Sequence, residues 1–288
     1  MTRTITHKHL KRQFEAFEET GNLNDLFAEL EFSTLLLPVD IENGSFPILK
    51  ANDKIFAPVF TDIHEYEKCD INGDFTLMPN GFDFYLDLLD ERIDGIIVDA
   101  EGERFPLTRE IRSLIMSNTP SKCNPRIFTM DEIRQKRESA NNSKLEEFLK
   151  DESNRWDYDR LMKLLLESDI YKVVLSREDL SDKAQDGVIS LDHMLPAALT
   201  TSFAESHALI YSSEGEVRKK DNPMNPYLQF ADIPELIRSA LLNDLDGIIL
   251  NENSQSIRIP REFLMDFYRN HAPACNGCYD GYAFTLNF

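Results

Sequence analysis

Near the end of the chain, Cys275 and Cys278 enclose two residues and follow His271, a spacing typical of zinc ligands. Zinc in structural sites takes four ligands, and no second Cys-x-x-Cys or histidine pair follows nearby in the sequence to complete the set. Completion by Cys69, by Cys123 or by a second chain stays open, as does a dithiol redox role. We favour a C-terminal segment that holds neither a metal nor any other cofactor.

Phe60-Thr61-Asp62 marks the point where an apolar run ends and polar residues begin. A strand that ends at a helix N-terminus presents N–H groups suited to an anion or a partner carboxylate, so these three residues are a candidate binding surface. Asp62 with Glu65 is also the pattern of a capping box, which explains the same residues without a ligand. The later stretch Tyr211-Ser212-Ser213, with Glu216, repeats the pattern.

Asp94-Gly95 and Asp246-Gly247 each stand directly before a short apolar run. As binding residues they would hold a carboxylate at the mouth of a strand. Asp-Gly is also a common turn in which glycine supplies a positive φ. We favour the turn and keep all four residues as binding candidates.

Catalytic motifs are missing from the sequence. The six histidines are scattered and none belongs to a nucleophile motif, and the 11 glycines never reach the spacing of a phosphate-binding loop. We therefore assign no catalytic residue and favour a protein that is not an enzyme.

The two Asp-Gly pairs belong to a longer internal repeat. Leu88 to Ile111 aligns without a gap with Ala240 to Phe263. A repeat of this length is a domain rather than a solenoid unit, and 288 residues fit about two domains. We expect a first module at residues 1–116, a charged and partly helical connector at 117–159, a second module at 160–270 and a C-terminal segment at 271–288.

Apolar spacing predicts the elements of each module. In the first, a helical region over residues 7–30 breaks at Gly21-Asn22, and three strands of an antiparallel meander follow at Thr34–Val39, Phe46–Leu49 and Lys54–Phe60. Both modules continue with a helix capped by Asn80 or Asp232, a buried strand at Ile96–Val98 or Ile248–Leu250, and a closing helix from Thr108 or Pro260. The predicted fold is therefore α+β, two tandem copies of a small module in which helices flank an antiparallel or mixed sheet.

The connector is dense in charge, and Thr129 followed by Glu132 predicts a capped helix within it. We expect this segment to pack loosely. The second module then opens with a helix that carries Leu161, Leu164 and Leu165, ahead of a strand at Tyr171–Leu175.

The charge of the chain excludes one class of partner. Asp and Glu number 51 against 31 for Lys and Arg, a formal charge of -20 that repels phosphate backbones, so we expect no nucleic acid partner. No apolar stretch follows the basic N-terminal residues, and no apolar run approaches the ~18 residues of a membrane span. The expected protein is cytoplasmic, does not bind membranes, and carries an acidic surface that suits a basic protein partner.

The chain resembles the N-terminal domain of the SseB family in four stretches that occur in the same order: Leu35-Leu36-Leu37-Pro38, Ala57 to Asp62, Asp94 to Val98, and Phe105-Pro106-Leu107 with Glu110. The resemblance covers about residues 23 to 116 and, more weakly, 160 to 268, where Leu209 to Ser213 departs from the Pro-Val-Phe-Thr-Asp stretch. It implies a bacterial cytoplasmic protein without an established catalytic activity, and it carries no site residues over to this chain.

Together these patterns favour a non-enzymatic binding or adaptor protein that recognises another protein. An enzyme with a small-molecule site in the cleft between the modules is the alternative from another class, because such clefts are favoured ligand locations. A metal-binding module built on His271, Cys275 and Cys278 is the third hypothesis.

We expect protein purified without an affinity tag to contain far less than one zinc per chain, because two thiolates and one histidine leave zinc one ligand short. Elemental analysis measures the zinc content. Stoichiometric zinc that is lost in a Cys275→Ser, Cys278→Ser double variant would overturn the favoured interpretation and establish the metal site.

Overall fold

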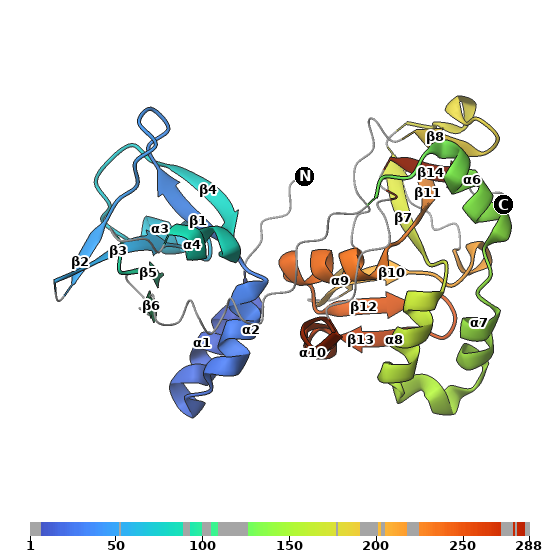
Figure 1. Ribbon diagram of the computed structural model, residues 1–288, viewed down its shortest axis with the longest axis horizontal. Coiled ribbons are helices and arrows are strands. Elements are labelled where there is room, and N and C mark those ends of the chain that lie inside the picture. The colour runs from blue at the N-terminus through green and yellow to red at the C-terminus, as the bar shows by residue number, and fades with distance from the viewer. Residues whose placement is uncertain are drawn as a thin grey trace. The chain divides into compact units, whose positions relative to one another are not determined.

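Figure 1 shows the computed structural model, which describes residues 7–51, 53–88, 93–99, 105–108, 126–176, 178–190, 201–202, 205–217, 225–271, 279 and 281–285. Helices and several small sheets make up these residues, which confirms the predicted α+β class. The chain divides into two compact units, a first unit of Met1–Pro120 with Leu241–Asp244 and a second unit of Ser121–Ala240 with Leu245–Phe288. None of the described helices is long and apolar enough to cross a bilayer.

Two helices open the first unit, α1 (Lys8–Thr20) and α2 (Leu23–Glu31). Gly21 ends α1 at φ 67, a left-handed conformation that costs glycine little, and its N–H donates to the Phe17 carbonyl. The Asn22 side chain then caps α2 by accepting from the Asn24 N–H. The predicted break at Gly21-Asn22 is confirmed.

The strands of the first unit form two sheets. In one, β1 (Thr34–Val39) pairs antiparallel with β4 (Thr76–Gly81). The other has the order β2 (Leu49–Ala51), β3 (Lys54–Val59), β5 (Gly95–Val98) and β6 (Phe105–Thr108), and β3 and β5 run parallel.

The predicted three-stranded meander is therefore wrong in part. Strands β2 and β3 form the expected antiparallel hairpin, but β2 begins at Leu49 rather than at Phe46. Strand β1 pairs with the distant β4, and it meets the end of β3 only at the bridge between Leu36 and Phe60. Apolar spacing identifies a strand but does not specify its neighbour, which is set by packing across the core.

Helix α3 (Ile63–Glu67) follows β3, and α4 (Phe82–Leu88) follows β4 directly. Asp62 caps α3 as predicted. The predicted cap at Asn80 is wrong, because Asn80 lies inside β4 opposite Leu35, and its side-chain amide donates to the Met78 carbonyl. The ladder with β1 extends through Gly81, so the helix cannot begin before Phe82.

One apolar core holds the first unit together. Helices α1, α2 and α4 bury their apolar stripes against β1, β3 and β5, and the Tyr85 hydroxyl within this core donates to the Leu35 carbonyl at 2.7 Å. The buried members include Leu10, Phe14, Leu26, Leu30, Leu35, Val59, Tyr85, Ile96 and Leu107.

The second unit contains two four-stranded sheets. The first has the order β13 (Ile257–Pro260), β12 (Gly247–Leu250), β10 (Glu205–Ile210) and β9 (Thr201–Ser202), and the second has the order β7 (Tyr171–Ser176), β11 (Asn225–Phe230), β14 (Tyr282–Thr285) and β8 (Val188–Ser190). Its helices include α8 (Tyr158–Glu167), α9 (Ile233–Leu242) and α10 (Arg261–His271), and short 3-10 turns lie at η2 (Ser181–Lys183) and η3 (Glu214–Glu216).

Strand register shows that both units contain the same module. Gly95 lies opposite Phe56 in the parallel β3–β5 pair, and Gly247 lies opposite His207 in the parallel β10–β12 pair. In each unit the third strand then runs antiparallel, with Gly95 opposite Thr108 and Gly247 opposite Pro260. The bridge from Leu36 to Phe60 also recurs, between Tyr171 and Tyr211. The fold is a tandem repeat of a small α+β module with a mixed sheet.

The two residues at which a closing helix was predicted to begin, Thr108 and Pro260, lie in strands β6 and β13 instead. Thr108 is the last residue of β6, and the residues that follow it, 109–125, lie outside the described part of the chain. Pro260 ends β13, and α10 begins one residue later at Arg261. Proline fits here because β13 is an edge strand, where a missing N–H breaks no ladder on the open side.

The predicted connector contains α6 (Met130–Ser139), α7 (Ser143–Lys150) and the 3-10 helix η1 (Glu152–Trp156). The capping box of Thr129 and Glu132 at the start of α6 is confirmed. The expectation of loose packing is wrong, because Ile133, Leu145 and Phe148 are buried, and Ile133 belongs to the core around Phe230. These few apolar side chains lie on one face of helices that are otherwise charged.

The C-terminal segment supplies β14, which lies between β11 and β8. Phe284 is fully buried edge-on to Phe230, with ring centroids 5.2 Å apart. The buried Gln229 amide donates to the carbonyls of Tyr279 and Tyr282 at 2.7 and 3.1 Å. The segment is therefore an integral part of the second sheet rather than an appendage.

We expect Gly247→Ala to destabilise the second unit by about 2 to 3 kcal/mol, since a Cβ there would lie 2.1 Å from the Ile259 carbonyl oxygen and the backbone has φ 152. Gly95→Ala should cost less, because the equivalent carbonyl, of Leu107, lies 2.5 Å away and φ is not positive. Denaturant unfolding measures both changes.

Gly281→Ala is the matched control, because a Cβ there meets nothing within 4 Å. Its unfolding free energy should stay within about 0.5 kcal/mol of the parent. Equal stability for Gly247→Ala and Gly281→Ala would show that close approach of the neighbouring strand does not require glycine.

Candidate functional site

The candidate residues Phe60, Thr61 and Asp62 connect β3 to α3, and they face inwards. Phe60 is fully buried and meets the Tyr66 ring edge-on at 5.4 Å. Thr61 and Asp62 are also buried. A partner that approached this strand end would therefore find little of the three side chains exposed.

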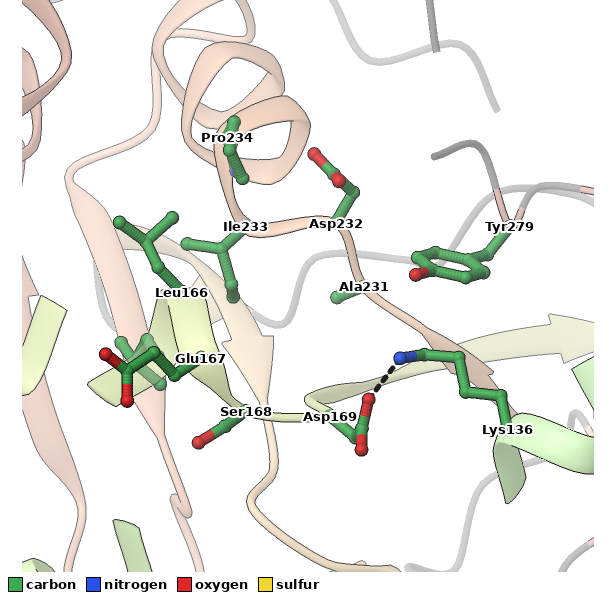
Figure 2. A pocket seen from close by; sticks show the side chains of 11 residues that line it. Lys136, Leu166, Glu167, Ser168, Asp169, Ala231, Asp232, Ile233, Pro234 and Tyr279 are labelled. Atoms are coloured by element: carbon green, nitrogen blue, oxygen red, sulfur yellow. Dashed lines mark hydrogen bonds and ion pairs between the residues drawn. The ribbon is translucent and has the colours of Figure 1, made fainter. Parts of the chain in front are cut away.

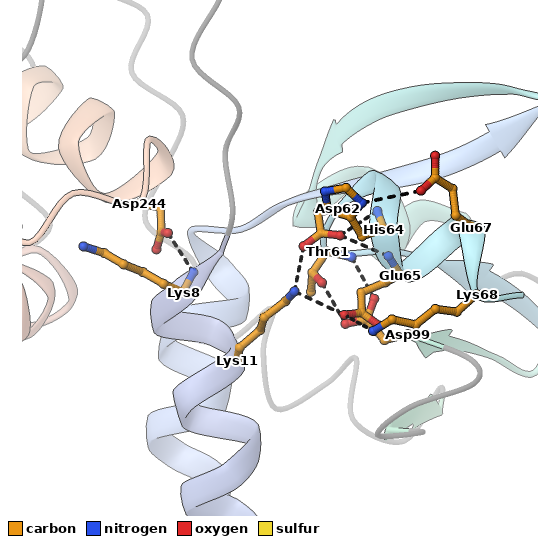
Figure 3. A network of polar contacts seen from close by, with 10 residues as sticks. All are labelled: Lys8, Lys11, Thr61, Asp62, His64, Glu65, Glu67, Lys68, Asp99 and Asp244. Carbon is orange, nitrogen blue, oxygen red and sulfur yellow. Dashed lines mark hydrogen bonds and ion pairs between the residues drawn. The ribbon is translucent and has the colours of Figure 1, made fainter. Parts of the chain in front are cut away.

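Thr61 is held by Asp99, the residue that follows β5 (Figure 3). The Thr61 N–H donates to Asp99 Oδ1 at 2.9 Å and the Thr61 hydroxyl donates to Oδ2 at 2.8 Å, while the Asp99 N–H donates to the Val59 carbonyl at 2.9 Å. Asp99 adopts φ 50, a conformation that Asp and Asn tolerate better than most residues. Burial raises the pKa of the Asp99 carboxyl, and its hydrogen bonds from Thr61 oppose that shift.

Asp62 joins a charged cluster that connects α1 to α3 (Figure 3). Its Oδ1 accepts the N–H groups of His64 and Glu65 at 2.8 and 3.0 Å, and its Oδ2 accepts from Lys11 Nζ at 2.6 Å. Burial acts to raise the pKa of Asp62, but hydrogen bonds from Lys11 and the two N–H groups outweigh it and lower the pKa. The N–H groups that could have bound an anion are already satisfied by Asp62.

Glu65 does not close the predicted capping box. Its carboxylate pairs instead with Lys68 at 2.8 Å and with Lys11 at 3.4 Å, and these cations lower its pKa. Two lysines within reach are a stronger attraction for this carboxylate than a single neutral N–H.

Asp94 and Asp246 each clamp the start of a central strand. The Ile55 N–H donates to Asp94 Oδ2 at 2.8 Å, and the Asp94 N–H returns a bond to the Ile55 carbonyl at 2.8 Å. Asp246 makes the same two bonds with Ser206, at 2.6 and 2.7 Å. The expected positive φ of the following glycine holds for Gly247 but not for Gly95.

In the second unit, Asn251 occupies the position of Asp99. The Ser212 N–H donates to Asn251 Oδ1, the Asn251 Nδ2 donates to Ser212 Oγ, and the Asn251 N–H donates to the Ile210 carbonyl, each at 2.9 Å. Asn251 shares the left-handed backbone, with φ 53. An amide therefore replaces a titratable carboxyl at the same position, and the bond between the two side chains is reversed, because the Thr61 hydroxyl donates to Asp99 whereas the Ser212 hydroxyl accepts from Asn251.

The predicted caps of the second unit have different outcomes. Asp232 caps α9 by accepting the Glu235 N–H at 3.1 Å. Ser213 precedes only the 3-10 turn η3, and its side chain makes no capping bond, so that prediction is wrong. The residues after Ser213 include Gly215, a poor helix former, and this explains why no α-helix forms there.

A cavity of about 190 Å³ lies in the second unit (Figure 2). Its lining combines Lys136 of α6, the end of α8 with Asp169, the start of α9 with Asp232, and Tyr279 ahead of β14. Sequence analysis identified Asp232 only as a cap and did not connect these segments. No local motif contains them, so the sequence carried no signal for this cavity.

Of the three proposed metal residues, the structure describes only His271. The His271 ring ends α10, where Nδ1 lies 3.1 Å from the Phe267 carbonyl oxygen and the ring stacks on Phe267 at 4.4 Å. Cys275, Cys278 and Cys123 lie outside the described residues, and Cys69 packs beside Phe56 in the first unit. Within the described part of the chain, no three His, Cys, Asp or Glu residues are grouped so that they could hold a metal ion.

Comparison of the chain with protein-family models, with curated proteins and with solved structures gives no match.

We expect Asp99→Asn to stabilise the first unit by roughly 1 kcal/mol at neutral pH, because the amide can reproduce the bonds that Asn251 makes to Ser212 without burying a charge. Burial raises the pKa of Asp99 in the folded state. The contribution of Asp99 to folding stability is therefore fully present below its pKa in the unfolded chain, and it is lost as the pH rises through its pKa in the folded protein. The advantage of the variant should therefore shrink on acidification. Denaturant unfolding at a series of pH values measures it.

Asn251→Asp is the reciprocal variant and should lose stability at neutral pH, with partial recovery in acid. If Asp99→Asn lost stability at neutral pH while Asn251→Asp kept it, the two positions would not be equivalent and burial would not disfavour the charged carboxyl.

Proposed function

We propose that this protein is a non-enzymatic binding protein, built of two SseB-like modules, that recognises a basic protein partner. The internal roles of Asp62, Asp94, Asp99 and Asp246 support this view, because each carboxylate accepts hydrogen bonds from backbone N–H groups of its own unit. The excess of acidic residues favours a partner of opposite charge.

A row of aromatic rings on the second unit carries the proposal. Trp156 ends η1 with 74% of its surface exposed, and its ring lies 6.3 Å from that of Tyr158. Tyr158 contacts Phe263 of α10 at 5.1 Å. The Arg155 guanidinium lies 5.8 Å from the Trp156 ring. Trp, Tyr and Arg dominate the binding energy of protein interfaces, and an exposed Trp supported by other rings is a preformed anchor.

Acidic side chains border this aromatic row. Asp157 and Asp159 flank Tyr158, and Glu262 and Asp266 lie near Phe263 on α10, all of them exposed. An apolar centre with a charged rim is the usual anatomy of a protein interface. These four carboxylates favour a partner whose complementary surface is basic around an apolar pocket.

We expect Trp156→Ala to reduce capture of the partner by roughly tenfold or more in affinity purification from the native cell, because truncation removes the anchor. The free energy of unfolding should change by less than about 0.5 kcal/mol, since the Trp156 side chain is exposed. Quantitative mass spectrometry of the captured proteins measures the loss.

Ile127→Ala is the matched control, because Ile127 is 77% exposed in the same unit and takes no part in the aromatic row. The parent and this control should retain the same partner. Trp156 is the only tryptophan in the chain, so its emission should shift to the blue when the purified partner binds. Equal capture by all three proteins would refute the proposed interface.

A further inference from the structure

One edge of the β1–β4 sheet is open in the first unit. Among the described strands, β4 pairs with β1 on one side and with no strand on the other (Figure 1). None of the residues of β4 is buried, and Met78 is 44% exposed although it lies opposite the buried Leu37. An exposed strand edge is a template on which another strand can pair, and proteins commonly cover it.

The second unit contains the equivalent edge in a covered state. The bridge at Leu36 in the first unit recurs at Tyr171 in the second. Pro79 lies opposite Leu36 and Phe230 lies opposite Tyr171, so β4 corresponds to β11. On β11 this edge is covered by β14, which pairs with it antiparallel, and four of the six residues of β11 are buried. One copy of the module therefore shows what the edge accepts, which is an extended strand.

The backbone groups of Leu77 point to the open edge. Leu36 bonds with Phe60 through both its N–H and its carbonyl, so it directs these groups away from β4. Opposite residues of an antiparallel pair either exchange both bonds or none, and the two kinds of pair alternate along the strands. Pro79, opposite Leu36, and Leu77, two residues earlier, therefore direct their backbone groups away from β1.

The register of β14 can be repeated on β4. Leu228 is the counterpart of Leu77, and it pairs with Phe284 of β14. Pro79 lacks an N–H, but the pairing of β11 with β14 runs over Tyr227 and Leu228 and does not include the counterpart of Pro79. A strand added at Leu77 in this register would thus lose no bond to the proline.

The charge at one end of this edge indicates the kind of strand. β1 ends at Val39, which lies opposite Thr76 at the start of β4. Asp40 and Glu42 follow β1, and Asp74 precedes β4. A strand in the register of β14 would bring its C-terminal end to Thr76, because it runs antiparallel to β4. Basic residues at that end would complement the three carboxylates.

We propose that the open edge of β4 binds an extended segment of a partner protein, which adds to the sheet as an antiparallel strand and carries basic residues at its C-terminal end. Main-chain bonds to Leu77 hold the segment, and a large apolar side chain lies beside Leu77 as Phe284 lies beside Leu228. This edge belongs to the first unit and the aromatic row at Trp156 to the second, so the proposal does not depend on the proposed function.

The probe for the test is a peptide, blocked at both ends, that copies Gly281 to Thr285 and ends in two added lysines. Titrated into the full chain, it should shift the amide resonance of Leu77 and slow hydrogen exchange of the Leu77 N–H by about tenfold or more, because this N–H gains an acceptor. The amide resonance of Leu228 should stay unchanged, because β14 already covers that position.

Two altered peptides are the matched controls. N-methylation of the peptide's phenylalanine removes the N–H that bonds to the Leu77 carbonyl, so this peptide should not bind. A peptide with the two lysines at its N-terminus should bind about threefold more weakly, because it keeps the charge but moves it away from the acidic end of the edge.

Variants of the chain locate the binding. Leu77→Pro removes the N–H without loss of a bond to β1 and should abolish binding, whereas Leu77→Ala keeps the N–H and should bind more tightly than Leu77→Pro. Glu42→Gln and Asp74→Asn should each weaken binding of the peptide by about threefold. Asp266→Asn removes an exposed carboxylate of the second unit and should change nothing. If Leu77→Pro does not fold, the N-methylated peptide still tests the main-chain bonds.

Equal binding of the parent and N-methylated peptides, or a shift at Leu228 in place of Leu77, would overturn the proposal. So would slow exchange of the Leu77 N–H in the free chain, because the edge would then already be covered. Sedimentation would show whether a second copy covers it. Trp156→Ala should bind the peptide as the parent does, so each of the two interfaces can fail without the other.

Discussion

The parallel pairing of β3 with β5 is the constraint on which the first unit depends. One residue, Asp99, secures it, because its left-handed backbone turns the chain after β5 and its carboxylate takes both donors of Thr61. With Thr61 fixed, Asp62 lies where it can cap α3 and meet Lys11 of α1. The positions of two helices thus follow from a single hydrogen-bonded side chain beyond the end of a central strand.

The second unit contains the equivalent parallel pair, β10 with β12, but the elements around this pair differ from those of the first unit. Asn251 and Ser212 reproduce the pair, but Ser213 has no capping bond and only a 3-10 turn follows. Among the described strands, the pair of β7 and β11 corresponds to the pair of β1 and β4 in the first unit, and β14 and β8 extend it to a four-stranded sheet. Lys136 and Tyr279, which line the cavity, come from segments outside the shared module, so the cavity is a property of this copy.

Local patterns in the sequence predicted part of the local structure. The caps at Asp62, Asp232 and Thr129 depend on residues two or three positions away, and each was predicted. The two central strands were likewise predicted, at Ile96–Val98 and Ile248–Leu250, and each begins one residue earlier in the structure, at Gly95 and Gly247. Strand pairing could not be predicted from the sequence, because the pairing of β1 with β4 depends on the packing of the whole core. This pairing includes Asn80, so Asn80 cannot cap the helix that follows. The candidate binding residues could be found by type, but their inward orientation depends on partners such as Asp99 and Lys11 that lie far along the chain.

Strand β14 has a consequence for the order in which the second unit can assemble. The residues of β8 are made well before those of β11, yet in their sheet β8 pairs with β14, which comes last. During synthesis, β7 and β11 can therefore join early, while one side of β11 stays open until Tyr282–Thr285 has emerged from the ribosome. Until then the open edge of β11 is a template for wrong pairing, and completion of the unit waits on a long-range contact that closes slowly.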